Sequence, residues 1–203
     1  MSPSAKESAP SPIYQGKYCK LLPLSLDDAL LYEHWLSNES FQAYHPLLKR
    51  VCPTLRSIHL HILNVQAEHS KIREVVIWHQ SAEVPIGLVS LSAIDEMNGK
   101  AELSVAVIRF LGSRCMWEAV HACITLSFEH LRLYKLIFHV NPRNLSLCKL
   151  LLRNGFTQEG LLQKEIEVEP GRRIDLVRFA LFRATYRDTP LMTALQRIVP
   201  ISI

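Results

Sequence analysis

The sequence predicts an α/β fold in which a mixed, mostly antiparallel central sheet is flanked by helices. Between Arg73 and Ile108 the apolar residues recur with the period of strands, in three segments separated by polar or Gly/Pro-containing turns. A long helical pattern follows Ser113, and two later strand patterns are joined by the turn Glu169-Pro170-Gly171-Arg172. Consecutive strands and a terminal hairpin both pair antiparallel strands, and the complete order of elements is β-α-α-β-β-β-α-β-α-β-β.

The N-terminal elements are a strand and two helices. Tyr18 to Leu24 alternates well enough for a strand. Ser25 then supplies a helix N-cap, with acidic residues in the first turn, for a helix that runs from Ala29 towards Asn38. A second helical pattern covers about Thr54 to Glu68.

The rest of the chain alternates between strands and helices. The three middle strands are expected at Arg73–His79, Ile86–Ile94 and Lys100–Ile108. Ser113 can cap a helix of about 18 residues. The later elements are the strand Lys135–Val140, the helix Leu145–Arg153 with Asn154-Gly155 as its C-terminal stop, and the strands Leu161–Val168 and Asp175–Phe182.

Composition divides the chain into one domain with two flanking segments. The chain has 203 residues, 48% of them apolar, which is enough to bury the core of one domain. Residues 1–12 are rich in Ser, Pro and Ala and are expected to form a disordered tail. The domain is expected over residues 13–188. The apolar residues 189–203, interrupted by Pro190 and Pro200, form a C-terminal extension that packs on the domain or on a second copy in a homodimer.

Charge, cysteine and histidine patterns argue against several classes of function. The net charge of +4 is mild and the basic residues are interleaved with acids, so nucleic-acid binding is not indicated. No apolar run approaches the ~20 residues that a membrane span needs, and a signal core is lacking, so we expect a cytoplasmic protein without membrane contact. Five cysteines without a Cys-x-x-Cys pair suggest neither a disulfide framework nor a zinc site. His59 and His61 would lie on different faces of a helix, and no metal site is expected.

The segment Arg109-Phe110-Leu111-Gly112-Ser113-Arg114 lies where a strand leads into the long helix. A helix N-terminus presents unpaired backbone N–H groups and a favourable dipole to a phosphate. Gly112 would let the backbone approach that phosphate closely. Arg114 either donates a charge-assisted hydrogen bond to the phosphate or fills the place where the phosphate should lie, and both alternatives stay open.

This segment and several others resemble the GCN5-related N-acetyltransferase (GNAT) superfamily, most closely its branch that acetylates ribosomal-protein alanine N-termini. The pyrophosphate loop of the family reads Gln/Arg-x-x-Gly-x-Gly/Ala, so Arg109 and Gly112 match it while Arg114 stands at the second small position. The resemblance covers about residues 17–184. The other matching segments are Pro23–Asp28, Lys100–Leu103, Trp117–Ala119, Asn141–Gly160 and Arg173–Phe179.

The resemblance implies a GNAT-like sheet and a binding site for acetyl-CoA as co-substrate. A backbone N–H on the strand would polarise the thioester carbonyl, the loop would hold the pyrophosphate, and Asn144 would bond the pantetheine arm. The family often places a Ser at the position of Leu147 and a Tyr near that of Leu151. The implied cofactor-binding residues are Val105, Ala106, Val107, Arg109, Leu111, Gly112, Ser113, Arg114 and Asn144.

The resemblance also implies direct transfer of the acetyl group to a primary amine, such as a peptide N-terminus, an amino sugar or a small amine. Glu102 is the implied general base, acting directly or through a water; its alternative role is that of an ordinary charged strand residue. Tyr44 and His45 lie where the family recognises its acceptor. His139 could line the acceptor cleft, or could be a hydrogen-bonded residue of its strand.

Two other interpretations compete with an active enzyme. One is a catalytically degenerate GNAT-fold protein that acts as a binding or regulatory module, which Arg114 and Leu147 favour. The other is a structural subunit that dimerises through its apolar C-terminus. Stabilisation of the protein by CoA would argue against the structural subunit.

Overall fold

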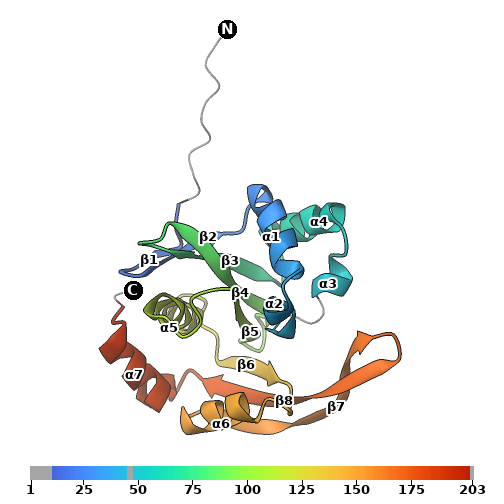
Figure 1. Cartoon of the computed structure of the whole chain (residues 1–203). Coiled ribbons are helices and arrows are strands. Elements are labelled where there is room, and N and C mark those ends of the chain that lie inside the picture. Colours follow the sequence, from blue (N-terminus) through green and yellow to red (C-terminus); the bar gives the residue numbers. More distant parts are fainter. Residues whose placement is uncertain (1–10, 45–47, 202–203) are drawn as a thin grey trace.

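The structure, a computed structural model, describes residues 11–44 and 48–201. An eight-stranded sheet carries helices on both faces (Figure 1), and its strand order is β1-β2-β3-β4-β5-β6-β8-β7. The strands are β1 (Tyr14–Gln15), β2 (Cys19–Pro23), β3 (Arg73–His79), β4 (Val84–Asp95), β5 (Lys100–Val107), β6 (Lys135–Val140), β7 (Thr157–Glu169) and β8 (Arg172–Phe182). All neighbouring strands are antiparallel except β5 and β6, which are parallel. The predicted α/β fold with a mixed, mostly antiparallel sheet is confirmed.

The four predicted helices are present, with small shifts at their ends. The α-helices are α1 (Ala29–Leu36), α2 (Glu39–Tyr44), α3 (Leu48–Val51), α4 (Leu55–Gln66), α5 (Arg114–Glu129), α6 (Leu145–Arg153) and α7 (Pro190–Ile198). Short 3-10 helices cover Leu26–Asp28 and Tyr186–Asp188. The predicted caps lie where expected, because Ser25 forms a capping box with Asp28 and Oγ of Ser113 accepts from the N–H of Met116 at 3.2 Å.

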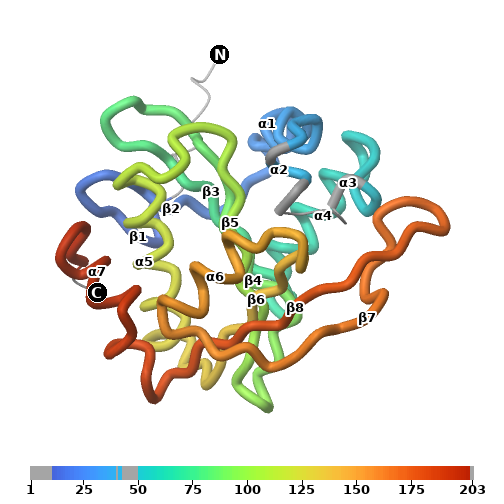
Figure 2. The backbone as a smooth tube through the Cα atoms, turned by 60° about the horizontal axis from the view of Figure 1, so that its bottom comes forward, coloured from blue at the N-terminus to red at the C-terminus, as the bar shows by residue number. Residues whose placement is uncertain are grey.

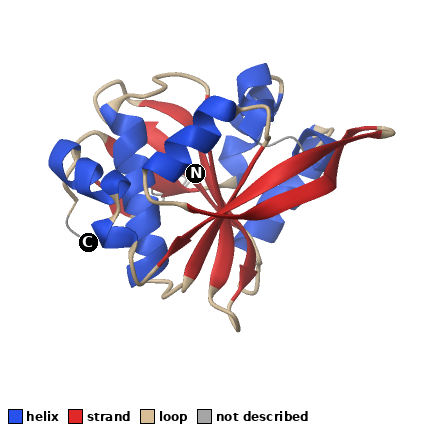
Figure 3. Cartoon of the chain, turned by 90° about the horizontal axis from the view of Figure 1, so that it is seen from below, coloured by secondary structure: helices blue, strands red, loops and turns tan. Residues whose placement is uncertain are grey.

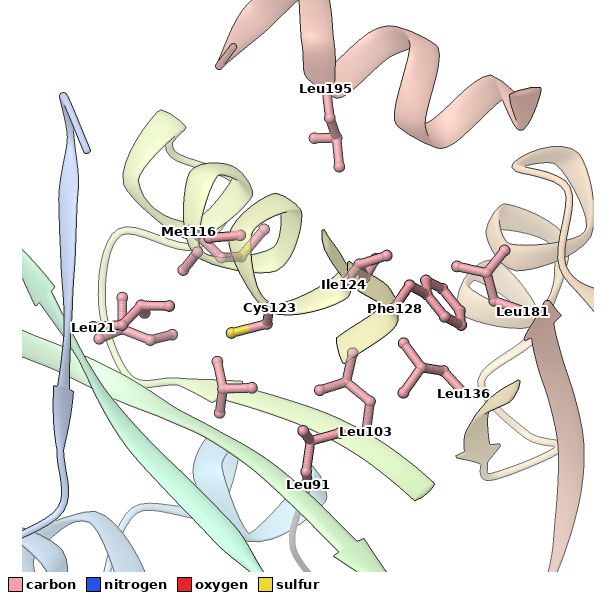
Figure 4. Close-up of a cluster of buried hydrophobic side chains, with 14 of the residues drawn as sticks. Leu21, Leu91, Leu103, Met116, Cys123, Ile124, Phe128, Leu136, Leu181 and Leu195 are labelled. Carbon is pink, nitrogen blue, oxygen red and sulfur yellow. The ribbon is translucent and has the colours of Figure 1, made fainter. Parts of the chain in front are cut away.

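Helices α2, α3 and α7 are missing from the predicted order. α2 and α3 span six and four residues, too few for a helical period to show. α7 begins at Pro190 because proline fits the first helical position, where the missing N–H removes no intrahelical hydrogen bond. Its buried Leu195 points toward α5 (Figure 4), so α7 packs on the domain. Of the expected N-terminal tail, residues 1–10 lie outside the described residues.

The two faces of the sheet carry two different cores. On one face, Leu91 and Leu103 lie beneath Cys123 and Phe128 of α5 (Figure 4). The opposite face is covered by α1 and α4. Its buried core includes Val76, Leu88 and Ala106, which are register neighbours on β3, β4 and β5, and Tyr32 and Trp35 of α1.

The β7–β8 hairpin projects from the body of the molecule (Figure 3) and runs towards α3 (Figures 1 and 2). Both strands begin earlier than predicted, and Gly171 makes the turn between them with a φ of +76°. Arg50 of α3 donates to the backbone carbonyl of Glu167 on β7, and its guanidinium lies 3.9 Å from the Glu167 carboxylate. Within the described ranges, no helix is both long and apolar enough to cross a membrane.

Candidate active site

Strands β5 and β6 form a fork. They pair only from Lys100 to Glu102, opposite Lys135 to Ile137, although β5 continues to Val107 and β6 to Val140. Beyond Glu102 the edge of β5 that faces β6 is therefore not paired with it.

The fork exposes two of the three backbone groups expected to bind the cofactor. The N–H of Ile108 donates to β4 at 2.9 Å, through the carbonyl of Ile86. Because successive residues of a strand direct their N–H groups to opposite edges, Val105 and Val107 direct theirs into the fork. Ala106 directs its N–H towards β4 and its side chain is fully buried. Of the expected range Val105 to Val107, the N–H groups of Val105 and Val107 are therefore the candidates for cofactor binding, and that role stays a prediction.

The fork opens into a cleft of about 1870 Å³. Its walls come from β3, β4, β5 and β6 of the sheet, from α2, α3, α4, α5, α6 and α7, and from the β7–β8 hairpin. Trp117 and Val120 of α5 and Leu147 and Leu151 of α6 make one stretch of the cleft apolar. A ligand with a long flexible arm could lie there with little exposure to water.

The loop before α5 has the geometry of an anion site. Gly112 has a φ of +74°, in the left-handed region that favours glycine, and no atom lies within 4 Å of the position that a Cβ would take. Ser113 caps the helix, which leaves the N–H groups of Arg114 and Cys115 without intrahelical partners. The space above Gly112 and the helix N-terminus suit a phosphate.

The side chain of Arg114 lies against Tyr18. Its Nη1 donates to the hydroxyl of Tyr18 at 3.0 Å, and its guanidinium lies 5.6 Å from the centre of the Tyr18 ring. Arg109 is exposed and makes no hydrogen bond or ion pair with any other described residue. Leu111 is 72% exposed and lines the cleft.

Asn144 lines the cleft and caps α6. Its Oδ1 accepts from the N–H of Leu147 at 3.1 Å. Because the helix uses this oxygen, the side-chain NH₂ of Asn144 is the group that can reach a ligand. Leu147 and Leu151 themselves contribute apolar surface and no hydroxyl group.

The structure brings Glu102 and His139 together at the mouth of the fork. Oε2 of Glu102 lies 3.0 Å from Nδ1 of His139, and Nε of Arg178 donates to Nε2 of the same ring at 3.1 Å. Since arginine can only donate, Nε2 is the acceptor nitrogen and Nδ1 carries the proton that His139 donates to Glu102. The ring is thus a neutral imidazole that orients the carboxylate, and the glutamate side chain keeps about a third of its surface exposed.

The other two acceptor residues are not placed at the site. Tyr44 ends α2, but its side chain is not described, and His45 lies outside the described residues. Sequence reasoning also missed a buried cluster at this end of the cleft, where Glu74 contacts His61 and Tyr32. The sequence gives no local signal for this cluster, because its three residues are far apart in the chain.

Burial raises the pKa of the thiols of Cys52, Cys115 and Cys123. Burial and the negative charge of Glu118 raise the pKa of Cys115 to about 12, and burial raises the pKa of Cys123 to about 12. Burial and the charge of Glu74 raise the pKa of Cys52 to about 11. Because the thiolate is the nucleophilic form, none of these three thiols is suited to carry an acyl group at neutral pH.

This chain is similar to known acetyltransferases in both sequence and structure. A family model described as an acetyltransferase (GNAT) domain matches residues 20–157. A relative described as a probable N-acetyltransferase, YjcK of Bacillus subtilis (strain 168), is 31% identical over 98 residues, which are 45% of this chain and 52% of the relative. The match thus spans about half the length of that curated relative.

Solved structures share the fold over most of the chain. The spermidine N-acetyltransferase of Vibrio cholerae in complex with CoA and spermine is 20% identical, with a TM-score of 0.71 over 83% of this chain and 98% of that one. The spermidine/spermine N-acetyltransferase SpeG of the same organism is 23% identical, with a TM-score of 0.66 over 84% and 96% of the two chains. At these identities the likeness shows the shared fold alone. The family model, which covers more than half of the sequence, places this chain in the GNAT acetyltransferase family.

Proposed function

We propose that this chain is an N-acetyltransferase that transfers the acetyl group of acetyl-CoA directly to a primary amine. The observation that carries the proposal is the fork between β5 and β6, which places unpaired N–H groups of Val105 and Val107 beside Glu102. A thioester and an amine held in such a fork would need only proximity, one proton acceptor and donors for the developing oxyanion.

The residues around the cleft fit acetyl-CoA. The loop at Gly112 and the first turn of α5 would bind the pyrophosphate through backbone N–H groups. The NH₂ group of Asn144 would donate to a carbonyl of the pantetheine arm, along the apolar walls formed by α5 and α6. The N–H groups of Val105 and Val107 would face the thioester carbonyl.

Glu102 would act as the general base, directly or through a water. His139 holds Oε2 of the carboxylate, and Oε1 has no hydrogen-bond partner among the described residues. Glu102 would take a proton as the amine nitrogen forms its bond to the carbonyl carbon, and the carbon–sulfur bond would break. A proton returned to the thiolate through the water of the cleft completes the products, an amide and free CoA.

The first test is a calorimetric titration of the purified protein with acetyl-CoA and with free CoA, followed by an assay of CoA release with primary amines. We expect micromolar binding of both ligands, and acetylation of at least one class among peptide N-termini, amino sugars and small amines. A folded protein that binds neither ligand would overturn the proposal in favour of a degenerate binding module. Binding without turnover on any amine class would favour a CoA-binding regulatory module.

A further inference from the structure

Glu74 on β3 is a buried carboxylate whose second oxygen is unused. Its side chain is 1% exposed, and its Oε2 accepts from the hydroxyl of Tyr32 at 3.2 Å and lies 3.0 Å from Nε2 of His61. Oε1 has no hydrogen-bond partner among the described residues, and both Glu74 and His61 line the cleft. Because a buried carboxylate is costly unless hydrogen-bonded, Oε1 is suited to receive a donor that enters from the cleft.

The strand register connects this carboxylate to Glu102. Glu74 lies opposite Ser90, Ser90 lies opposite Ser104, and Ser92 lies opposite Glu102. Paired residues and residues two apart on a strand share one face of a sheet, so these five polar side chains lie on the face covered by α1 and α4. All five line the cleft. We call them the polar row.

The polar row is confined to one end of this face. The next register neighbours on the same three strands are Val76, Leu88 and Ala106, which are buried in the apolar core under α1 and α4. Glu74 and Glu102 are at the two ends of the row. Two strand spacings of about 4.8 Å and two residues of about 3.4 Å separate their Cα atoms by about 12 Å.

The ion-pair partners of the two carboxylates in the described part of the chain are histidines. Among the described residues, neither makes an ion pair with a lysine or an arginine, and their ion-pair partners are His61 and His139. The residues between them along the row, Ser90, Ser92 and Ser104, carry hydroxyl groups and no positive charge. Two negative groups at the ends of one polar row favour a ligand that has a positive group at each of its ends.

We propose that the acceptor is a diamine, with its reactive amino group at Glu102 and its second, ammonium group bound by Oε1 of Glu74. The inference rests on the proposed acetyltransfer to an amine and assigns a substrate class to it. Tyr32 and His61 hold Oε2 and so fix the carboxylate with Oε1 free for the ammonium. The fixed separation of the two carboxylates would select the chain length between the two amino groups.

The experiment compares unbranched alkyl diamines of increasing length with alkyl monoamines of the same carbon number. In the wild-type protein we expect kcat/KM to reach a maximum at one diamine length and to exceed that of the matched monoamine by about 10-fold or more, as one charge-assisted hydrogen bond would give. Glu74→Gln should abolish the preference by raising the KM for the diamine to that for the matched monoamine. Glu68→Gln removes the same charge from an exposed residue that makes no ion pair with the other described residues, and should keep the preference.

The outcomes separate this proposal from the proposed function. Monoamines acetylated as well as diamines of every length would overturn the diamine site while leaving the acetyltransferase activity in place. If no amine is acetylated, the CoA-bound wild-type protein should still be stabilised against thermal unfolding by the best-fitting diamine, and Glu74→Gln should not be. Equal thermal shifts for diamines and monoamines in the wild-type protein would also overturn the proposed diamine site. This comparison does not depend on the folding of any variant.

Discussion

The part of the cleft proposed to bind the cofactor, here called the cofactor half, is built from residues that are close in the chain, whereas the part proposed to bind the amine, the acceptor half, is built from residues that are far apart. In the cofactor half, the fork strand β5, the loop at Gly112 and the start of α5 follow one another within residues 100–129. In the acceptor half, the buried cluster joins Tyr32, His61 and Glu74 from α1, α4 and β3. The first half can be recognised as a local motif, and the second exists only once the sheet has formed.

Because of this difference, substitutions should affect the two halves of the cleft differently. In the proposed function, backbone N–H groups would make much of the contact with the cofactor, and they would tolerate side-chain changes as long as the loop and the fork keep their shapes. The acceptor half depends on the side chains of the polar row. If the proposal holds, a change there would alter which amine is bound and leave the cofactor site intact.

Of the substitutions considered, loss of the proposed general base Glu102 should lower activity most. We expect Glu102→Gln to lower kcat by about 100- to 1,000-fold, the usual contribution of a positioned general base, because the amide cannot take the proton of the amine. The affinity for acetyl-CoA should stay within about twofold, since Glu102 makes no part of the backbone cradle. Steady-state assays and calorimetry measure the two quantities.

A matched control separates base chemistry from loss of charge in the cleft. Glu165 of β7 also lines the cleft but lies on the hairpin, away from Glu102 and His139. Glu165→Gln should lower kcat far less than Glu102→Gln. An equal loss in both variants, or full activity in Glu102→Gln, would remove Glu102 from the mechanism.

A buried carboxylate supports the cofactor half from outside the cleft. Glu118 of α5 is 1% exposed and accepts from the backbone N–H groups of Lys17, Tyr18 and Cys19 at 3.0, 2.7 and 2.7 Å. Glu118→Gln retains the shape but turns one acceptor into a donor facing these N–H groups. We expect it to lower the free energy of unfolding by about 2–4 kcal/mol, measured by urea denaturation.

The control for Glu118 is on the same helix. Glu129 bonds Tyr186 and Arg187 with a partly exposed side chain, so Glu129→Gln should cost less than about 1 kcal/mol. Unfolding midpoints that shift equally for the two variants would show that the three backbone hydrogen bonds to Glu118 contribute no more than a surface contact.

The local elements of the structure could be predicted from the sequence, whereas contacts between distant segments could not. The helix pattern and the Ser113 cap gave α5, and alternation gave β3 and β6 with the bounds that the structure has. The contact between Glu102 and His139 was not predicted, because it depends on how far β5 and β6 pair before they diverge. The role of Glu118 could not be predicted either, since nothing in Trp117-Glu118-Ala119 shows that three N–H groups from residues about a hundred positions earlier converge on its carboxylate.

The glycine of the anion loop should give a smaller effect that is specific to the cofactor. A Cβ at Gly112 meets no atom within 4 Å, so the cost of Gly112→Ala is backbone strain at a φ of +74°, about 1–2 kcal/mol of stability. The same methyl group would enter the space proposed for the pyrophosphate. We expect about 10-fold weaker binding of acetyl-CoA, measured by calorimetry.

Gly171 provides a closely matched control for that strain. It has a φ of +76° in the β7–β8 turn, also with no atom within 4 Å of a Cβ. Gly171→Ala should lose a similar amount of stability but keep its affinity for acetyl-CoA. Equal affinities in the two variants would mean that the loop at Gly112 does not bind the pyrophosphate.

Substitutions of Arg114 are expected to change the affinity for acetyl-CoA least. From the sequence, this residue could either bind the phosphate or occupy its place. In the structure the Arg114 guanidinium is held by the hydroxyl and the ring of Tyr18, and in that position it would neither bind the phosphate nor obstruct it. We therefore expect Arg114→Ala and Arg114→Gly to change the calorimetric affinity for acetyl-CoA by less than about threefold. Binding 10-fold weaker in both variants would mean that Arg114 leaves Tyr18 to grip the phosphate, and Tyr18→Phe should then strengthen binding by releasing it. Binding 10-fold tighter in Arg114→Gly would mean that the side chain obstructs the loop, and the departure from the family pattern at this position would then weaken the cofactor half.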